Sequence, residues 1–197
     1  MAGPLRTPSM VRERILGAAV ALFAEQGFDS TSVQQIVARA NVTKGALYHY
    51  FGSKDDLLYE IYHGLLAVQL AGLDDIRSRD LPRPEMVRGI IANLIGTTTE
   101  RVEQTAVFTR EMHRLQPDRR AAMRADRRRY HETFRALIAE GQAAGDFSAT
   151  ISAETVTLMV FGMINQLPTW YRPNGPKTAD QLAAEVTDFV LAALRTG

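Results

Sequence analysis

The sequence contains no cysteine. Disulfide bonds, thiolate nucleophiles and cysteine-ligated zinc or iron–sulfur sites are therefore excluded. It also lacks any run of roughly 18 consecutive apolar residues, so we expect no membrane-spanning helix and no membrane partner. A chain without cysteine fits a reducing compartment, and we expect a cytoplasmic protein.

Signals for strands and for catalysis are missing as well. No segment alternates apolar and polar residues convincingly over the length of a strand, whereas apolar residues recur at the three- and four-residue spacing of helices. From this spacing we expect an all-α protein. The motifs H-E-x-x-H, G-x-S-x-G and the P-loop do not occur, so we expect no catalytic residue, metal site or cofactor. An all-α hydrolase or metal enzyme is the rival interpretation.

Charge is distributed unevenly along a chain whose formal net charge is only +1. Residues 1–54 carry six basic and three acidic side chains, while the remainder carries 17 basic and 19 acidic ones. A small basic head on a larger, mildly acidic body is typical of a nucleic-acid reader with a second domain. We therefore predict a DNA-binding domain over 1–54 and a separate second domain over 55–197.

Start and stop signals divide the chain into helices. For the second helix, both Thr31…Gln34 and Ser32…Gln35 fit a capping box, and the sequence leaves this choice open. Thr178…Gln181 is another such box. The expected helices are about 9–26, 31–40, 43–50, 53–78, 85–103, 105–115, 118–144, 152–170 and 178–195.

Residues 33–51 read VQQIVARANVTKGALYHYF, which is two short helices joined by a tight turn. Such a pair on a basic segment predicts a helix-turn-helix motif that binds double-stranded DNA. Thr43 and Lys44, at the start of the second helix, favour a phosphate, and Gly45 lets the backbone approach the DNA. The alternative is that short helices of this composition occur in any helical bundle, with Tyr48 or Tyr50 half in the core.

Further residues complete the predicted DNA contacts. Polar-tipped aromatics stand at the end of the helix, where they can donate to the DNA backbone. Lys54 lies in the first turn of the next helix, where a cation opposes the helix dipole, so we expect it to contact a phosphate. The aromatic residues are Tyr48, His49 and Tyr50.

The segment TSVQQIVARANVTKGALYHYFGSK resembles the DNA-binding signature of the TetR family of bacterial transcriptional repressors, over about 45 residues from Ile15 to Leu58. The resemblance implies DNA contacts from Thr43, Lys44, Gly45, Tyr48, His49 and Lys54, and a phosphate contact from Ser32. It implies a buried face of Ile15, Ala19, Phe23, Gly27, Ile36, Ala40, Leu47 and Phe51. Tyr50 stands where the family usually has histidine, and Asn41 where it usually has glycine.

The resemblance implies that residues 55–197 are the ligand-binding and dimerisation domain. It also implies a homodimer that reads a palindromic operator and leaves it on binding a small molecule. Apolar residues at helical spacing in the last two helices are candidates for the dimer interface; the alternative is that they form only core within one chain. These residues are Val156, Met159, Met163, Leu182, Val186, Phe189 and Val190.

The stretch from Trp170 to Pro176 resembles a W-Y-R-P-x-G segment of family members that respond to acyl-CoA thioesters. An acyl-CoA effector of lipid catabolism is therefore expected; the alternative is a multidrug-type or other apolar-ligand sensor that controls an efflux or metabolic operon. The arginine run 119–129 either binds CoA phosphates or is a solvated face. Candidate ligand residues are Phe108, Met112, Phe134, Phe161, Asn165, Trp170, Tyr171 and Arg172.

Overall fold

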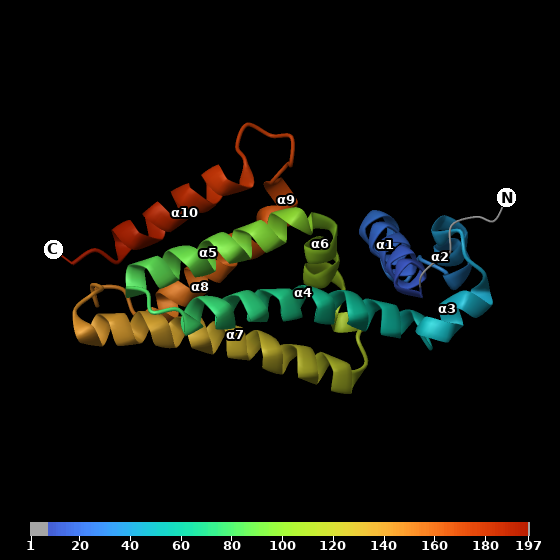
Figure 1. Cartoon of the computed structure of the whole chain (residues 1–197), viewed down its shortest axis with the longest axis horizontal. Helices are drawn as coiled ribbons and strands as arrows, with labels where there is room; N and C mark the ends of the chain where they lie inside the picture. The colour runs from blue at the N-terminus through green and yellow to red at the C-terminus, as the bar shows by residue number, and fades with distance from the viewer. Residues whose placement is uncertain (1–7, 197) are drawn as a thin grey trace.

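The computed structural model describes residues 8–196, and every regular element within that range is a helix (Figure 1). The all-α class predicted from the sequence is confirmed. The elements are α1 (Pro8–Gln26), α2 (Val33–Ala40), α3 (Lys44–Tyr50), α4 (Lys54–Ser78), α5 (Arg83–Glu100), α6 (Val102–Glu111), the short 3-10 helix η1 (Met112–Arg114), α7 (Pro117–Ala144), α8 (Ala153–Asn165), α9 (Leu167–Trp170) and α10 (Ala179–Ala193).

Side-chain caps explain the starts of α2, α3, α4, α8 and α10. At the start of α2 the capping box uses Ser32 and Gln35 rather than Thr31 and Gln34. Thr31 is buried instead, and its hydroxyl donates to the carbonyl of Gly27 at 2.8 Å. Asn41 ends α2 at φ 49°, in the left-handed region that asparagine tolerates. The predicted Thr178…Gln181 box at α10 is confirmed.

Two parts of the expected helix pattern were wrong. The break expected between 103 and 105 falls at Arg101, and α6 ends at Glu111 before the 3-10 helix η1. We expected a single helix over 152–170, but α8 ends at Asn165 and the four-residue α9 begins at Leu167. Pro168 has no N–H to donate, and its ring would clash with the preceding turn if the helix were continuous. It therefore lies in the first turn of a new helix, α9. The chain bends here instead of extending α8.

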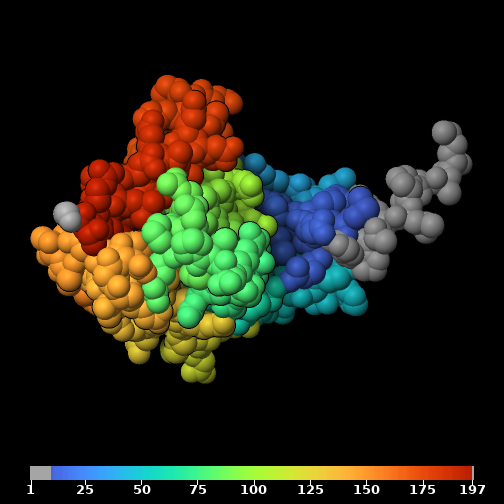
Figure 2. Space-filling model, turned by 60° about the vertical axis from the view of Figure 1, so that its left-hand side comes forward, coloured from blue at the N-terminus to red at the C-terminus, as the bar shows by residue number. Residues whose placement is uncertain are grey.

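The helices form a head and a body (Figure 1). Helices α1–α3 form the head at one end, and α4 runs from the head along the body, where α5 and α7 pack on it. The space-filling view shows the head as the narrower end of the molecule, and the loop after α9 standing out from the body (Figure 2). No helix of the described residues is long and apolar enough to cross a membrane.

Two apolar cores fill the structure, and the smaller one is shared between head and body. It combines the buried face of α1–α3 with the first half of α4, including Leu58 and Tyr62. Val107, Leu115 and Met123 of the body complete it. The head is therefore not packed independently of the residues that follow position 54.

Polar contacts join α6 to α4 and to the head along this shared core, and we call this region the seam. The buried Tyr62 hydroxyl donates to the Val107 carbonyl at 3.0 Å, and burial raises the pKa of Tyr62. Glu111 is only 7% exposed and accepts from the Phe28 N–H at 3.4 Å and from Arg110 Nε at 2.9 Å. The Arg110 guanidinium also donates to the Phe23 carbonyl at the end of α1.

Replacing Glu111 with alanine should lower the free energy of unfolding by about 1–2 kcal/mol, because the variant leaves a buried N–H and part of a guanidinium unpaired. Urea denaturation measures the change. Glu103→Ala, an exposed position on the same helix, is the matched control and should shift the midpoint far less. Equal shifts in the two variants would show that the seam contact contributes no stability.

Candidate nucleic-acid interface

The α2–α3 turn is fixed by contacts within the head. The Arg14 guanidinium donates to the carbonyls of Ala40 and Asn41, the latter at 2.8 Å, and so satisfies backbone oxygens at the end of α2. The Thr43 hydroxyl accepts from the Ala46 N–H at 3.1 Å and caps α3. These contacts orient α3 relative to α2 before any DNA is present.

One face of α2 and α3 is buried, as the sequence predicted. Burial of these apolar side chains against α1 supplies the main free energy that holds α3 in place. The buried residues are Ile15, Ala19, Phe23, Ile36, Ala40, Leu47 and Phe51.

The opposite face of α3 is open to solvent. Thr43, Lys44, Gly45 and His49 are exposed, and Tyr48 keeps 46% of its surface accessible. Lys44 Nζ lies 5.8 Å from the centre of the Tyr48 ring, a cation–π arrangement. A Cβ on Gly45 would meet only the Thr43 hydroxyl, at 3.9 Å. The fold itself therefore leaves space in front of the first turn of α3.

Most cations of the head are already bound to other groups in the protein. Over residues 8–54, Lys44 alone among the lysines and arginines has no carboxylate or carbonyl partner; Arg6 lies outside the described residues. The free positive charge of the head therefore coincides with the exposed face of α3. The partners of the others are Glu60 for Arg12, two carbonyls for Arg14, Glu25 for Arg39 and two carbonyls for Lys54.

Lys54 is directed inward. Its Nζ donates to the carbonyls of Phe28 at 2.7 Å and Thr31 at 2.9 Å, and it lies 4.2 Å from the centre of the Phe28 ring. Partial burial lowers the pKa of Lys54. This lysine ties the α1–α2 loop to the start of α4, which accounts for a cation in the first turn of that helix without any phosphate.

Two other predicted contact residues have roles within the head. The Ser32 hydroxyl is exposed but takes part in the capping box with Gln35. Tyr50 is half-buried against the head core, and its ring meets the His49 ring edge-on at 4.9 Å. Thr43, Lys44, Gly45, Tyr48 and His49 remain the continuous exposed set.

Comparison with known proteins agrees with this geometry. Residues 15–61 match the family model described as bacterial regulatory proteins of the tetR family, and residues 80–194 match the tetracyclin repressor-like C-terminal domain. The chain belongs to the TetR family of bacterial DNA-binding transcriptional repressors. It is accordingly a regulator and not an enzyme.

Relatives of this repressor match it along nearly its whole length. The transcriptional repressor KstR2 of Mycobacterium tuberculosis is 27% identical over 184 residues, which is 93% of this chain and 92% of KstR2. The solved structure of that protein, a ketosteroid transcriptional regulator, aligns with TM-score 0.88 at 26% identity and covers 100% of this chain and 99% of KstR2.

Two further solved structures share the fold. PfmR of Thermus thermophilus aligns with TM-score 0.84 at 30% identity and covers 93% of this chain and 100% of PfmR. AibR in complex with isovaleryl coenzyme A and operator DNA aligns with TM-score 0.79 at 22% identity, covering 91% of this chain and 97% of AibR. At that identity the likeness to AibR is one of fold.

The predicted ligand residues of the body fall into two groups. In the first group the Phe134 and Phe161 ring centres are 5.6 Å apart, Phe161 stacks on His131 at 3.9 Å, and Arg127 lies 5.7 Å from the Phe108 ring centre. Met112 lines a cavity with Arg127 and His131.

The second group lies at α9 and the loop that follows it. Trp170 is exposed, Tyr171 is buried and Asn165 is half-buried at the end of α8. The Arg172 guanidinium donates to the Tyr171 carbonyl at 2.9 Å, within its own loop. The structure therefore does not bring all eight predicted ligand residues into one cavity.

The predicted dimer residues are also divided. Met159 and Phe189 are each 64% exposed, while Met163 and Val186 are half-buried. The remaining three, Val156, Leu182 and Val190, lie in the core of the body. Met159 and Phe189 line an apolar cavity of about 300 Å³ between α8 and α10.

A pair of lysine variants separates DNA contact from stability. Lys44→Met should leave the free energy of unfolding within about 0.5 kcal/mol of wild type, because in the described part of the chain Lys44 has no carboxylate or carbonyl partner and contacts only the exposed Tyr48 ring. It should weaken binding to a duplex selected by the native protein from a random-sequence library, and reduce the salt slope of log K by about one. Fluorescence anisotropy at several salt concentrations measures both.

Lys54→Met is the matched comparison. It should lower the free energy of unfolding by about 1–2 kcal/mol in urea, because two backbone carbonyls lose a charged donor. If Lys54→Met leaves stability unchanged while Lys44→Met lowers it, the roles assigned to the two lysines are reversed.

Proposed function

We propose that the protein is a cytoplasmic homodimeric repressor that leaves a palindromic operator when an acyl-CoA thioester of lipid catabolism binds to its body. The observation that carries the DNA-binding part is the open face of α3, where Thr43, Lys44, Gly45, Tyr48 and His49 are exposed around the free cation of the head. A short helix that presents such a face suits the major groove.

The apolar face of α8 and α10 supports a dimer. Met159 and Phe189 expose most of their surface beside a cavity lined almost entirely by apolar side chains. Large exposed apolar residues grouped on one face are typical of a protein–protein interface. Two copies joined through these helices would bury the face in a four-helix contact and present two α3 helices to one palindrome.

Changing this face should therefore break the dimer. Phe189→Arg should convert the wild-type dimer into a monomer in size-exclusion chromatography with light scattering, because burying an unpaired guanidinium is costly. Val68→Arg is the control, since Val68 is an exposed apolar residue of α4 away from the face. A wild-type protein that is monomeric at every concentration, or a Phe189→Arg variant that stays dimeric, would contradict this interface.

Three observations support an acyl-CoA effector. The KstR2 relative is described as a ketosteroid transcriptional regulator, and AibR, which has the same fold, is solved in complex with isovaleryl coenzyme A and operator DNA. In this chain an exposed indole and an exposed guanidinium, Trp170 and Arg172, stand together in the W-Y-R-P-N-G segment. An indole can stack on an adenine ring, and a guanidinium can bind a phosphate.

Release from DNA follows from linkage between the two sites. An effector that binds better to a dimer with wrongly spaced α3 helices lowers DNA affinity, and DNA lowers effector affinity by the same factor. Arg110 joins α6 to α1, Glu111 joins it to the loop after α1, and Tyr62 joins it to α4, so a shift of the body would move the head. The bound effector would thus act on α3 without touching it.

The effector class can be tested with the single tryptophan. Trp170 fluorescence should change on adding acyl-CoA esters, and the same esters should release a labelled operator duplex, with half-effects at similar concentrations. Free CoA and the matching free fatty acids are the controls. Release by apolar drugs, with no response to any CoA ester, would replace this effector by the multidrug-type alternative.

A further inference from the structure

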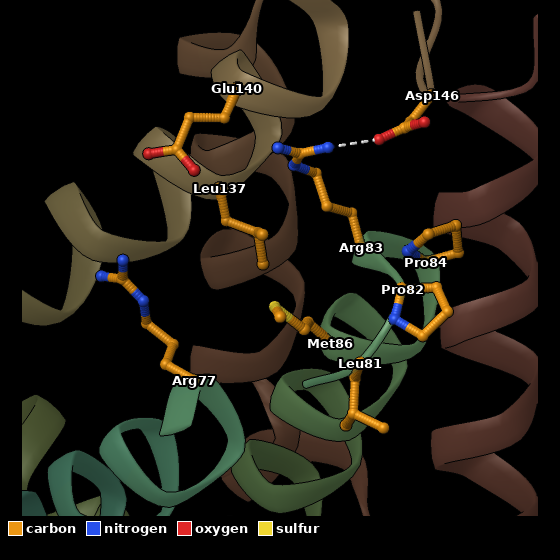
Figure 3. Close-up of a pocket in the computed structure, with 9 residues that line it drawn as sticks. All are labelled: Arg77, Leu81, Pro82, Arg83, Pro84, Met86, Leu137, Glu140 and Asp146. Carbon is orange, nitrogen blue, oxygen red and sulfur yellow. Dashed lines mark hydrogen bonds and ion pairs between the residues drawn. The ribbon is translucent and has the colours of Figure 1, made fainter. Parts of the chain in front are cut away.

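Two cavities of the body differ in the net charge of the residues that line them. At the end remote from the head, a cavity of about 380 Å³ lies between the ends of α4 and α7 and the start of α5. Figure 3 shows Arg77 and Glu140 on one side of it and the Arg83–Asp146 ion pair, at 2.5 Å, on the other. Its two cations and two anions balance, so it does not favour a charged ligand of either sign.

A second cavity, the α7–α8 groove, has an excess of positive charge. It has a volume of about 400 Å³ and lies between α7 and the first half of α8, with Met112 of η1 beside it. Four guanidinium groups and two carboxylates line it, which leaves two positive charges while His131 is neutral. Burial, and then Arg127, lower the pKa of His131. The charged residues are Arg124, Arg127, Arg128, Arg135, Glu132 and Glu154.

The carboxylates of the α7–α8 groove are taken up by one arginine. Arg135 donates to Glu132 at 2.6 Å and lies 3.9 Å from Glu154. Among residues 8–196, Arg124 and Arg127 have no hydrogen-bond or ion-pair partner, and Arg128 acts on Glu132 only at longer range. Three guanidinium groups therefore face the groove with donors to spare.

Arg127 is the informative member of the three. Its side chain is half-buried beside the Phe108 ring, and burial lowers its pKa. A cation withdrawn from water without a carboxylate destabilises the fold unless an anion compensates it. The ring contact recovers only part of that free energy.

The rest of the arginine run shows that this arrangement belongs to one side of α7. Arg119 pairs with Asp55 at 2.8 Å and with Asp56, and Arg129 pairs with Asp74 at 2.8 Å. The side of α7 that faces α4 is thus neutralised, while the side that faces α8 is not. The sequence is rich in arginine along the whole run, so it does not show which side of α7 carries the unpaired arginines.

Apolar surface adjoins the free cations. Leu158, on α8, is 59% exposed and lines the α7–α8 groove, and Met112 is half-buried at its edge. The His131 ring also lines the groove and stacks on the buried Phe161 ring, so the apolar contact surface extends toward the core. A ligand that fits has an anionic end and an apolar part.

We propose that the α7–α8 groove binds the phosphate-bearing end of an amphipathic ligand, with phosphate oxygens accepting hydrogen bonds from Arg124, Arg127 and Arg128 and the apolar part lying over Leu158. An excess of two charges matches a phosphate better than a single carboxylate, and guanidinium forks bind phosphate through paired hydrogen bonds. The inference rests on the proposed function in taking an acyl-CoA as the source of that phosphate.

Calorimetry with two matched ligands tests the proposal. Octanoyl-CoA and octanoyl-pantetheine share the acyl chain and thioester, but only the first carries phosphates. Arg127→Gln should lower the affinity for octanoyl-CoA by about tenfold or more, because a charge-assisted hydrogen bond to phosphate is lost. It should leave octanoyl-pantetheine within about twofold.

Arg129→Gln is the matched control, since that arginine is paired with Asp74 on the other side of α7. It should change neither affinity by more than about twofold. The melting temperature of Arg127→Gln should equal or exceed that of wild type, because the substitution removes an unpaired half-buried charge and breaks no ion pair. This readout separates lost binding from lost folding.

The outcomes distinguish the groove from the effector assignment. Wild-type affinity of Arg127→Gln for octanoyl-CoA, or an equal loss for both ligands, overturns the phosphate site even when acyl-CoA esters release DNA. The nucleotide portion of coenzyme A, 3′-phosphoadenosine diphosphate, is the probe without an acyl chain. If it binds in an Arg127-dependent way while no acyl-CoA releases DNA, the phosphate site stands and the effector assignment fails. If neither it nor octanoyl-CoA binds the wild type, the phosphate site is wrong.

Discussion

The packing of the head against α4 is the constraint on which the rest of the structure depends. The core of α1–α3 is closed by the first half of α4 and by body residues such as Val107 and Met123, so the head has no separate interior. Because apolar burial of this kind is a large part of the stability of so small a unit, the head cannot rotate freely without exposing it. The direction of α3 is consequently determined by the body, which is what a regulator needs if ligand and DNA are to influence each other.

Unpaired groups, rather than total composition, mark the surfaces that interact. The head is basic, yet of its described cations only Lys44 lacks a carboxylate or carbonyl partner within the protein. The same holds for the arginine run of α7, where Arg119 and Arg129 pair with α4 while Arg124 and Arg127, which line the groove beside α8, have no ion-pair partner among the described residues. In both places carbonyls and carboxylates of the protein bind many of the cations, and the unpaired cations lie on one face of α3 or on the side of α7 toward α8.

Helix α8 connects the two proposed surfaces of the body. Met159 faces the apolar cavity shared with α10, while the adjacent Leu158 faces the groove shared with α7. A ligand held between α7 and α8 would therefore act on the same helix that contributes to the proposed dimer face.

The sequence by itself determined the helical class, nearly all helix ends and the exposed face of α3, because helical periodicity, caps and the helix-turn-helix act over a few residues to a few turns. The prediction of one helix over 152–170 was wrong for a local reason as well, because Pro168 interrupts the helix there. The inward turn of Lys54, the seam at Glu111 and the division of the arginine run were decided only by tertiary structure, because their partners lie far away along the chain. A side chain's type states what it can bind; only packing decides whether another part of the protein binds it first.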